Sequence, residues 1–234
     1  MLLCCLCGSV YSLGDYERFR FIDRKNNNFL FRGNNIVSNG QLQYDWLVQG
    51  IKETAKSANI SDFPDSFFLI DFCLLEVEYS DWSTEEAFFA QNSTLGQFVH
   101  NPIIGALEDP MWFPESLRQV LALNVSGFDD LPGTVSLLSK LLSTPYPQPT
   151  VIYVHCEAGK DRTGEVSGAY YISQLGLSFN EALYYDNKCV EGSRDIEMFS
   201  GWAFEWYCWY LKYGFENFKS LDCVPDPSFD GHCF

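Results

Sequence analysis

Residues 150–177 constrain the fold of this chain more than any other stretch. Residues 150–154 (TVIYV) form a short run of apolar, mostly β-branched side chains, which predicts a buried parallel strand. Apolar residues at helical spacing over 163–177 predict an amphipathic helix with Gly176 near its end. Only a tight loop fits between the two. The sequence therefore predicts a strand, a loop and a helix N-terminus in direct succession.

This loop has the composition of an anion site. Its backbone N–H groups and the positive end of the helix dipole would point at one place. The same field favours the thiolate form of Cys156, and the thiolate is the nucleophilic form of cysteine. The guanidinium of Arg162 can grip two oxygens of a phosphate, and Gly159 permits the turn. The predicted phosphate-binding residues are Glu157, Ala158, Gly159, Lys160, Asp161 and Arg162.

The loop resembles the signature His-Cys-x5-Arg-Ser/Thr of the cysteine-based protein tyrosine phosphatase superfamily. The matching residues are His155, Cys156, Arg162 and Thr163, and Gly159 falls at the family's loop glycine. The short loop looks like the dual-specificity and atypical branch, and residues 159–164 are similar to loops of microbial tyrosine and phosphoinositide phosphatases. The resemblance implies attack of Cys156 on phosphorus, a phosphocysteine intermediate and its hydrolysis by water. It implies neither a metal nor a cofactor. Thr163 would hydrogen-bond the sulfur and ease its departure.

In that superfamily an aspartate some way before the cysteine protonates the leaving group. Residues 123–133 carry turn-forming residues and two adjacent acids, Asp129 and Asp130. We prefer Asp129, because it has the Asp-x-x-Pro form seen in relatives. Asp130 could instead cap a helix over 134–144. Asp161 is the rival acid within the loop, where it could equally form a salt bridge that orients Arg162.

The acid and base next to the cysteine bear on the substrate. Lys160 could bind a second phosphate at the mouth of the pocket, as on an inositol ring, or it could be a solvated lysine. Glu157 stands where lipid-directed relatives often carry a base. We expect a phosphatase for phosphotyrosine and also for phosphoserine or phosphothreonine. The alternatives are a phosphoinositide phosphatase and a catalytically weak phosphate-binding pseudophosphatase.

The rest of the chain predicts an α/β fold with a mostly parallel central sheet flanked by helices. Strands are expected at 29–32 and 67–75, and helices at 42–57, 83–99, 115–123 and 194–213. Aromatic residues of the last helix recur at a spacing of three to four, which predicts a core face. The expected organisation is a signal peptide or tail over 1–14, one phosphatase domain over 15–220 and a C-terminal tail over 221–234.

Charge excludes some partners. The net charge of −16 leaves no basic stripe for nucleic acid, and it suits an anionic membrane poorly. The apolar start of the chain is too short to span a bilayer, so no stable membrane span is expected. The expected partner is a phosphorylated protein or phosphoinositide substrate.

The cysteines bear on the compartment. The four cysteines of the C-terminal quarter permit two disulfides in three pairings: Cys189, Cys208, Cys223 and Cys233. Cys73 lies in a buried run, as an inert thiol or as a partner that protects oxidised Cys156 in a reversible disulfide. With the apolar N-terminus, this pattern favours the secretory pathway or the extracellular space. Reduced cysteines in the cytoplasm are the alternative.

Overall fold

A five-stranded sheet forms the centre of the molecule. The computed structural model describes residues 18–124, 129–191 and 194–233. The strand order is β1-β2-β7-β5-β6, and every neighbouring pair is parallel except the edge pair β1–β2. A separate hairpin joins β3 to β4. The strands are β1 (Arg20–Lys25), β2 (Asn28–Gly33), β3 (Val37–Ser38), β4 (Gln41–Leu42), β5 (Phe68–Cys73), β6 (Gly96–His100) and β7 (Thr150–His155).

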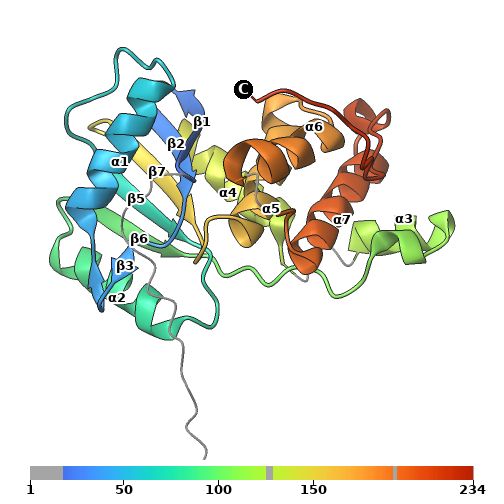
Figure 1. The fold of residues 1–234 in the computed structure, drawn as a ribbon, viewed down its shortest axis with the longest axis horizontal. Helices are drawn as coiled ribbons and strands as arrows, with labels where there is room; N and C mark the ends of the chain where they lie inside the picture. The colour runs from blue at the N-terminus through green and yellow to red at the C-terminus, as the bar shows by residue number, and fades with distance from the viewer. Residues whose placement is uncertain (1–17, 125–128, 192–193, 234) are drawn as a thin grey trace, which may run out of the picture.

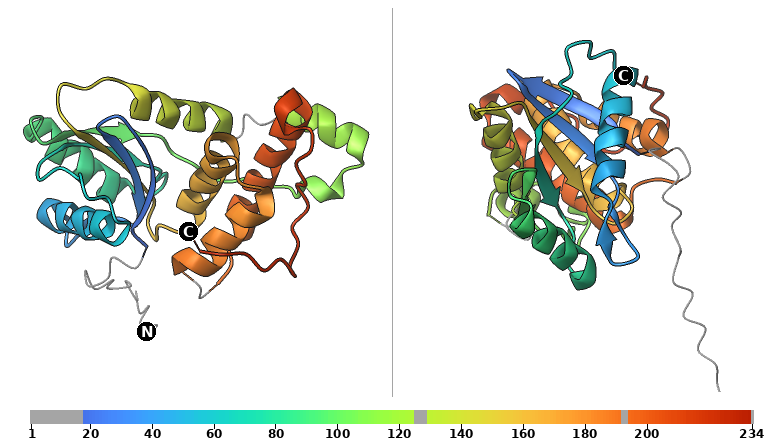
Figure 2. Two further views of the ribbon diagram at one scale, coloured as in Figure 1. Left: turned by 90° about the horizontal axis from the view of Figure 1, so that it is seen from above. Right: turned by 90° about the vertical axis from the view of Figure 1, so that its left-hand side faces the viewer.

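Helices cover both faces of this sheet (Figure 1). The α-helices are α1 (Tyr44–Ser57), α2 (Tyr79–Gln91), α3 (Glu115–Asn124), α4 (Leu131–Ser143), α5 (Asp161–Tyr170), α6 (Phe179–Tyr184) and α7 (Met198–Gly214). Tyr171–Leu175 and Tyr185–Glu191 are π-helical, and Pro110–Trp112 and Glu216–Phe218 are 3-10 turns. Figure 2 shows the sheet from its edge, with α1 on one side and α4 and α5 on the other. The predicted α/β class is therefore confirmed.

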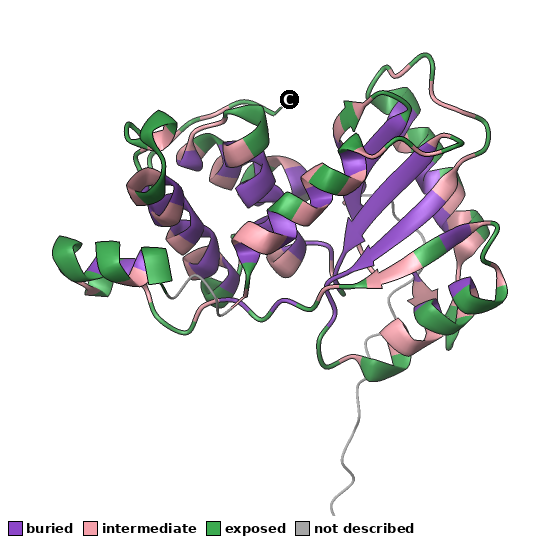
Figure 3. Cartoon of the chain, turned by 180° about the vertical axis from the view of Figure 1, so that it is seen from behind, coloured by how far each residue is buried: buried purple, intermediate pink, exposed green. Residues whose placement is uncertain are grey.

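The alternation of β7 explains why both faces need cover. Val151 and Tyr153 belong to the core cluster that also contains residues of α1, while Ile152 and Val154 belong to the cluster with α4 to α7. Successive strand residues point to opposite faces, so an uninterrupted apolar run requires two buried faces. Figure 3 shows the inner strands β2, β5 and β7 as buried and α3 as largely exposed.

Two of the predicted elements differ in kind from the observed ones, and the last helix begins four residues later than predicted, at Met198. The helix expected over 83–99 ends at Gln91, and Gly96–His100 forms the edge strand β6 instead. The helix predicted over 163–177 is α-helical only to Tyr170, and a π-helical turn carries it to Gly176, which adopts a φ of +76°. The strand β7 and the helix α3 lie within one residue of their predicted bounds. None of the described helices is long and apolar enough to cross a membrane.

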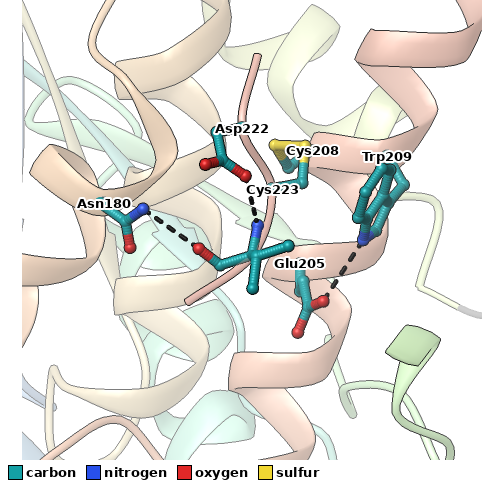
Figure 4. The surroundings of a disulfide bond; sticks show 7 residues. Asn180, Glu205, Cys208, Trp209, Asp222 and Cys223 are labelled. Carbon is teal, nitrogen blue, oxygen red and sulfur yellow. Dashed lines mark hydrogen bonds between the residues drawn. A yellow bond between two sulfur atoms is a disulfide. The ribbon is translucent and has the colours of Figure 1, made fainter. Parts of the chain in front are cut away.

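Two disulfides hold the end of the chain against the helices. Cys189 pairs with Cys233 and Cys208 pairs with Cys223, so all four cysteines of the C-terminal quarter are used. Figure 4 shows the second bridge, beside which the Asn180 side-chain amide donates to the carbonyl oxygen of Val224 at 3.1 Å. Residues after α7 are therefore bound covalently to the domain. The N-terminal stretch 1–14 lies outside the described residues.

Candidate active site

The loop predicted to bind phosphate follows the carboxyl end of the central strand, β7. β7 pairs with β2 on one side and with β5 on the other, and the loop follows its last residue, His155. The helix α5 begins at Asp161, and the N–H of Gly164 donates to the carbonyl oxygen of Lys160 at 2.6 Å. The carboxyl ends of parallel strands are where ligands of such sheets bind. The strand, loop and helix N-terminus occur in the predicted order.

Three consecutive carbonyl groups of the loop are held by other parts of the chain. The oxygen of Glu157 accepts from the backbone N–H of Asn35 at 2.9 Å. The oxygen of Ala158 accepts from Arg18 Nη1 at 2.5 Å, and that of Gly159 from Arg32 Nη2 at 2.9 Å. In a trans peptide the N–H points opposite to the C=O. Anchoring these carbonyls outward therefore turns the N–H groups of residues 158, 159 and 160 toward the inside of the loop.

Gly159 is required at its position. Its φ is +69°, and a Cβ there would lie 2.4 Å from the carbonyl oxygen of Gly33 at the end of β2. Both the left-handed backbone and the close approach of β2 exclude a side chain. Glycine thus lets the loop pack against the neighbouring strand.

Cys156 and Arg162 occupy opposite ends of the loop. Cys156 is 2 % exposed and lies within electrostatic reach of Arg162. The Arg162 guanidinium donates to both carboxylate oxygens of Glu78, at 3.2 and 2.8 Å. Although partial burial opposes it, this pairing lowers the pKa of Glu78. Glu78 therefore occupies both donor positions of the Arg162 guanidinium. A phosphate that binds Arg162 would have to displace this carboxylate. Thr163, fully buried on α5, has no hydrogen-bond partner for its hydroxyl among the described residues.

Lys160 lies neither at the mouth of the pocket nor in solvent, so both roles weighed for it are wrong. Its side chain is fully buried and acts on the carboxylates of Asp186 and Asp161. Asp186 also forms a buried ion pair with Arg32, whose Nη2 lies 2.7 Å from Asp186 Oδ1. Asp186 follows the loop by many residues, so no local pattern could indicate that Lys160 would be buried. Glu157 is exposed and Ala158 is half-buried.

The three candidate acids occupy different environments. Asp129 accepts from the backbone N–H of Ile104 at 3.0 Å and from that of Gly105, and burial raises the pKa of its carboxyl despite these two bonds. Asp130 caps α4, where it accepts from the N–H of Gly133 at 3.3 Å.

Asp161 is held as a carboxylate. It receives two hydrogen bonds from Arg194, at 2.7 and 2.6 Å, and one from the N–H of Glu197 at 2.7 Å. Although burial opposes them, these bonds lower the pKa of Asp161. Its salt bridge is thus with Arg194, and the alternative of a bridge that orients Arg162 is wrong.

Glu165 is a site residue that the sequence did not indicate. It is fully buried in the second turn of α5 and interacts with both Asp129 and Cys156. Burial, followed by the charge of Asp129, raises the pKa of Glu165 well above its usual range. The Glu165 carboxyl interacts with the hydroxyl of Ser200 and with the Asp129 carboxyl, and two such neighbouring acids do not readily both carry a charge. A charged residue on the buried side of a helix that follows the cysteine is the signal that could have found it.

Asp129 also lines a mostly apolar cavity of about 210 Å³. The cavity is bounded by the backbone of residues 105–108 and by side chains of the helices, among them Leu131 and Trp206. This surrounding explains the desolvation of the Asp129 carboxyl.

His155 lies behind the loop in a buried polar cluster. Its Nε2 is 2.9 Å from Asp71 Oδ1 and 3.6 Å from Glu85 Oε1, and its Nδ1 is 3.3 Å from the carbonyl oxygen of Cys156. Burial works against a charged imidazole, but the surrounding acids and Cys73 raise the pKa of His155 well above its usual range. Burial raises the pKa of the Cys73 thiol to about 12, and this cysteine forms no disulfide.

Comparison with known proteins gives similarities at the level of structure. No family model matches the chain, and no curated protein sequence matches it. Similar solved structures include kinase associated phosphatase, with a TM-score of 0.42, 13% identity and coverage of 86% of this chain and 96% of that chain. The core catalytic domain of the PP-IP phosphatase SIW14 from S. cerevisiae gives 0.43, 16%, 85% and 88%. The Yvh1 phosphatase domain from Chaetomium thermophilum gives 0.39, 16%, 81% and 94%. All three are phosphatases by name, and the chemistry of the present site is argued from its own residues alone.

Proposed function

We propose that this chain is a phosphatase that hydrolyses phosphomonoesters through a phosphocysteine intermediate. The observation that carries the proposal is the outward anchoring of the carbonyls of Glu157, Ala158 and Gly159. It aims successive N–H groups into the loop that begins at Cys156 and ends at Arg162. Preorganised donors of this kind stabilise the charge that develops on a transferring phosphoryl group.

The reaction has two steps. The Cys156 thiolate attacks phosphorus, the bond from phosphorus to the ester oxygen breaks, and the departing oxygen takes a proton from the general acid. Water then attacks the phosphocysteine, gives its proton to the conjugate base of that acid, and expels the thiolate. The hydroxyl of Thr163 would donate to the departing sulfur. Arg162 would hold two phosphate oxygens throughout, once the substrate has displaced Glu78.

Asp129 is the proposed general acid. Burial raises the pKa of its carboxyl, which favours the protonated form, and Glu165 links it to the neighbourhood of Cys156. Asp161 is a poor donor, because its pairing with Arg194 favours the carboxylate. Asp130 is less suited to the role, because one of its carboxylate oxygens accepts a hydrogen bond from the backbone N–H of Gly133 at the start of α4.

The proposed substrates are phosphotyrosine and phosphoserine or phosphothreonine. Two acids, Glu78 and Glu157, flank the arginine, and Lys160 is buried, so the described residues offer little positive charge for a second phosphate. This distribution counts against the phosphoinositide alternative. The pseudophosphatase alternative keeps phosphate binding without turnover.

A substrate panel with matched variants tests the proposal. Wild type, Cys156→Ser and Arg162→Ala are assayed on aryl phosphates, phosphopeptides and phosphoinositides. We expect wild type to release phosphate from aryl phosphates and phosphopeptides, and Cys156→Ser to bind phosphate without turnover. The enzyme hypothesis fails if the Cys156→Ser protein is as active as wild type. Phosphate binding without turnover in wild type would favour the pseudophosphatase.

The aspartates are then compared on leaving groups of differing pKa. We expect Asp129→Asn to reduce kcat by about 10²–10⁴ on alkyl phosphates, in the range of general acid catalysis, and much less on phosphates of acidic phenols. Asp130→Asn is the adjacent control. A larger loss in Asp161→Asn than in Asp129→Asn would move the acid role into the loop.

We also infer that the protein works in an oxidising compartment, in the secretory pathway or outside the cell. The four C-terminal cysteines are placed as two disulfides, and disulfides persist in such compartments. Thiol counting on native and denatured protein from oxidising and reducing hosts tests this. If these four cysteines react as free thiols in denatured protein from its natural source, the result would favour the cytoplasm.

A further inference from the structure

Four polar residues form a buried cluster on the sheet face below α2. Asp71 and Cys73 lie two positions apart on β5 and therefore point to the same face, Cys73 is in register with His155 of β7, and Glu85 comes from α2. All four are fully buried. We call them the Asp71–Cys73–Glu85–His155 cluster. None of them takes part in the proposed reaction.

The donor atoms converge on one point. Cys73 Sγ, a Glu85 carboxylate oxygen and a His155 ring nitrogen all lie within 4.8 Å of one another. The Nε2 atom of His155 is 2.9 Å from an oxygen of Asp71 and 3.6 Å from an oxygen of Glu85. Around a tetrahedral zinc with bonds of about 2.0–2.3 Å, neighbouring ligand atoms are roughly 3.3 Å apart. The two distances from His155 Nε2 to the carboxylate oxygens, 2.9 and 3.6 Å, lie on either side of that value.

Three carboxylate oxygens of the cluster also lack a hydrogen bond. In the described part of the chain, Asp71 Oδ2 and both oxygens of Glu85 are buried without a hydrogen bond. The ion pairs that these two acids form there are with His155 alone. Buried acids without donors are costly, and native proteins normally satisfy such atoms. A divalent cation would satisfy all of them at once.

We propose that the Asp71–Cys73–Glu85–His155 cluster is a structural zinc site. The ligands would be Cys73 Sγ, His155 Nε2 and a carboxylate oxygen each from Glu85 and Asp71. One thiolate, one imidazole and two carboxylates suit zinc, whereas magnesium and calcium prefer oxygen ligands alone. A site with four protein ligands and no solvent access is of the closed, structural kind. On coordination the Cys73 thiol, the Nε2 atom of His155 and any protonated carboxyl among the ligands release their protons to solvent.

The zinc would fix the base of the loop. The other nitrogen of His155, Nδ1, faces the carbonyl oxygen of Cys156 at 3.3 Å. When Nε2 binds metal, Nδ1 carries the proton and donates to that carbonyl, an arrangement in which an outer partner orients a metal-bound histidine. The metal would hold the histidine, and the histidine would hold the backbone at Cys156. Zinc takes no part in phosphoryl transfer here, so the site does not depend on the proposed function.

The test measures metal content in the full chain. Wild type, Cys73→Ser, Glu85→Gln and Cys156→Ser are produced in zinc-supplemented medium, purified without chelators and analysed by elemental mass spectrometry. We expect about one zinc per folded chain in wild type and in Cys156→Ser, and a fraction of that in the other two, because each removes a ligand. Cys156→Ser is the matched control, since Cys156 is the other buried free cysteine.

Cobalt gives a second readout that needs no variant to fold. Wild type refolded with Co²⁺ should show a thiolate-to-cobalt charge-transfer band, and Cys156→Ser should show the same band. Zinc-free folded wild type whose melting temperature does not respond to added Zn²⁺ would overturn the proposal. So would loss of the metal in Cys156→Ser, because the ion would then be bound at the loop.

Discussion

The buried ion pair between Arg32 and Asp186 gives the sharpest stability prediction. Arg32 and Asp186 are 0 % and 2 % exposed, and the pair lies directly behind the loop, where Arg32 also donates to the carbonyl oxygen of Gly159. Changing Asp186 to Asn keeps the shape but removes the charge. It leaves the guanidinium, and Lys160 beside it, as buried cations without their shared carboxylate.

The magnitude follows from burial. Breaking a buried pair by removing one partner destabilises a protein by about 3–5 kcal/mol. With a urea m-value of about 2–3 kcal/mol/M, the midpoint should fall by roughly 1–2.5 M. The melting temperature should fall by about 6–20 °C, because 1 kcal/mol corresponds to roughly 2–4 °C at this chain length.

An exposed pair with the same N–O distance is the control. Arg24 and Asp62 are also 2.7 Å apart, but their side chains are 43% and 63% exposed. Exposed pairs contribute little, so we expect Asp62→Asn to leave the urea midpoint unchanged within error. The two variants differ in burial and not in distance.

The assay is urea unfolding at pH 7 without reductant, followed by tryptophan fluorescence and far-ultraviolet circular dichroism. Coincident transitions for the two probes would support a two-state analysis. The variant Arg32→Met and its combination with Asp186→Asn complete a double-mutant cycle, in which we expect a destabilisation smaller than the sum of the single changes. The reasoning is refuted if Asp186→Asn shifts the midpoint no more than Asp62→Asn does.

Three further predictions concern the loop and the tail. Glu78→Gln should lower the inhibition constant of inorganic phosphate by about three- to tenfold, because the Arg162 fork loses a competing carboxylate that is only about one-fifth exposed; an increase would mean that Glu78 positions the arginine. Activity on alkyl phosphates should fall as the pH rises through the raised pKa of Asp129, since the protonated acid is required; a pH profile that keeps this fall in Asp129→Asn would contradict the assignment. Reduction of Cys208–Cys223 and Cys189–Cys233, whose cysteines are 15 and 44 residues apart, should destabilise the fold by about 3 and 4 kcal/mol on loop entropy; thermal unfolding with and without reductant measures it, and equal melting temperatures would argue against the bridges.

The elements predicted well are those whose signal is local. The apolar run that becomes β7, the glycine of the loop and the helix start after it all follow from neighbouring residues. The edge strand β6 was missed because its five residues lack a distinctive pattern, and they become a strand only by pairing with β5. The helix predicted over 83–99 was too long, because the helical spacing of the residues before β6 does not continue past Gln91.

The roles around the loop were harder to predict, since they depend on contacts between distant segments. Lys160 is buried because Asp186 and Arg32 meet it, and Arg162 faces Glu78 from before α2. The preference for Asp129 over Asp130 came from a motif, and the hydrogen bonds that now distinguish them involve the backbone at residues 104, 105 and 133. Sequence spacing could place both acids near the site, but it could not show which one was desolvated.

The three anchors of the loop carbonyls all come from the first 35 residues of the chain. Arg18, Arg32 and the N–H of Asn35 hold a loop that is made more than a hundred residues later. During synthesis these anchors are therefore made first. The signature sequence takes its shape only when it packs against the opening strands that carry them. A protease cut between residues 18 and 35 would weaken phosphate binding by the loop, although every residue of the loop itself would remain intact.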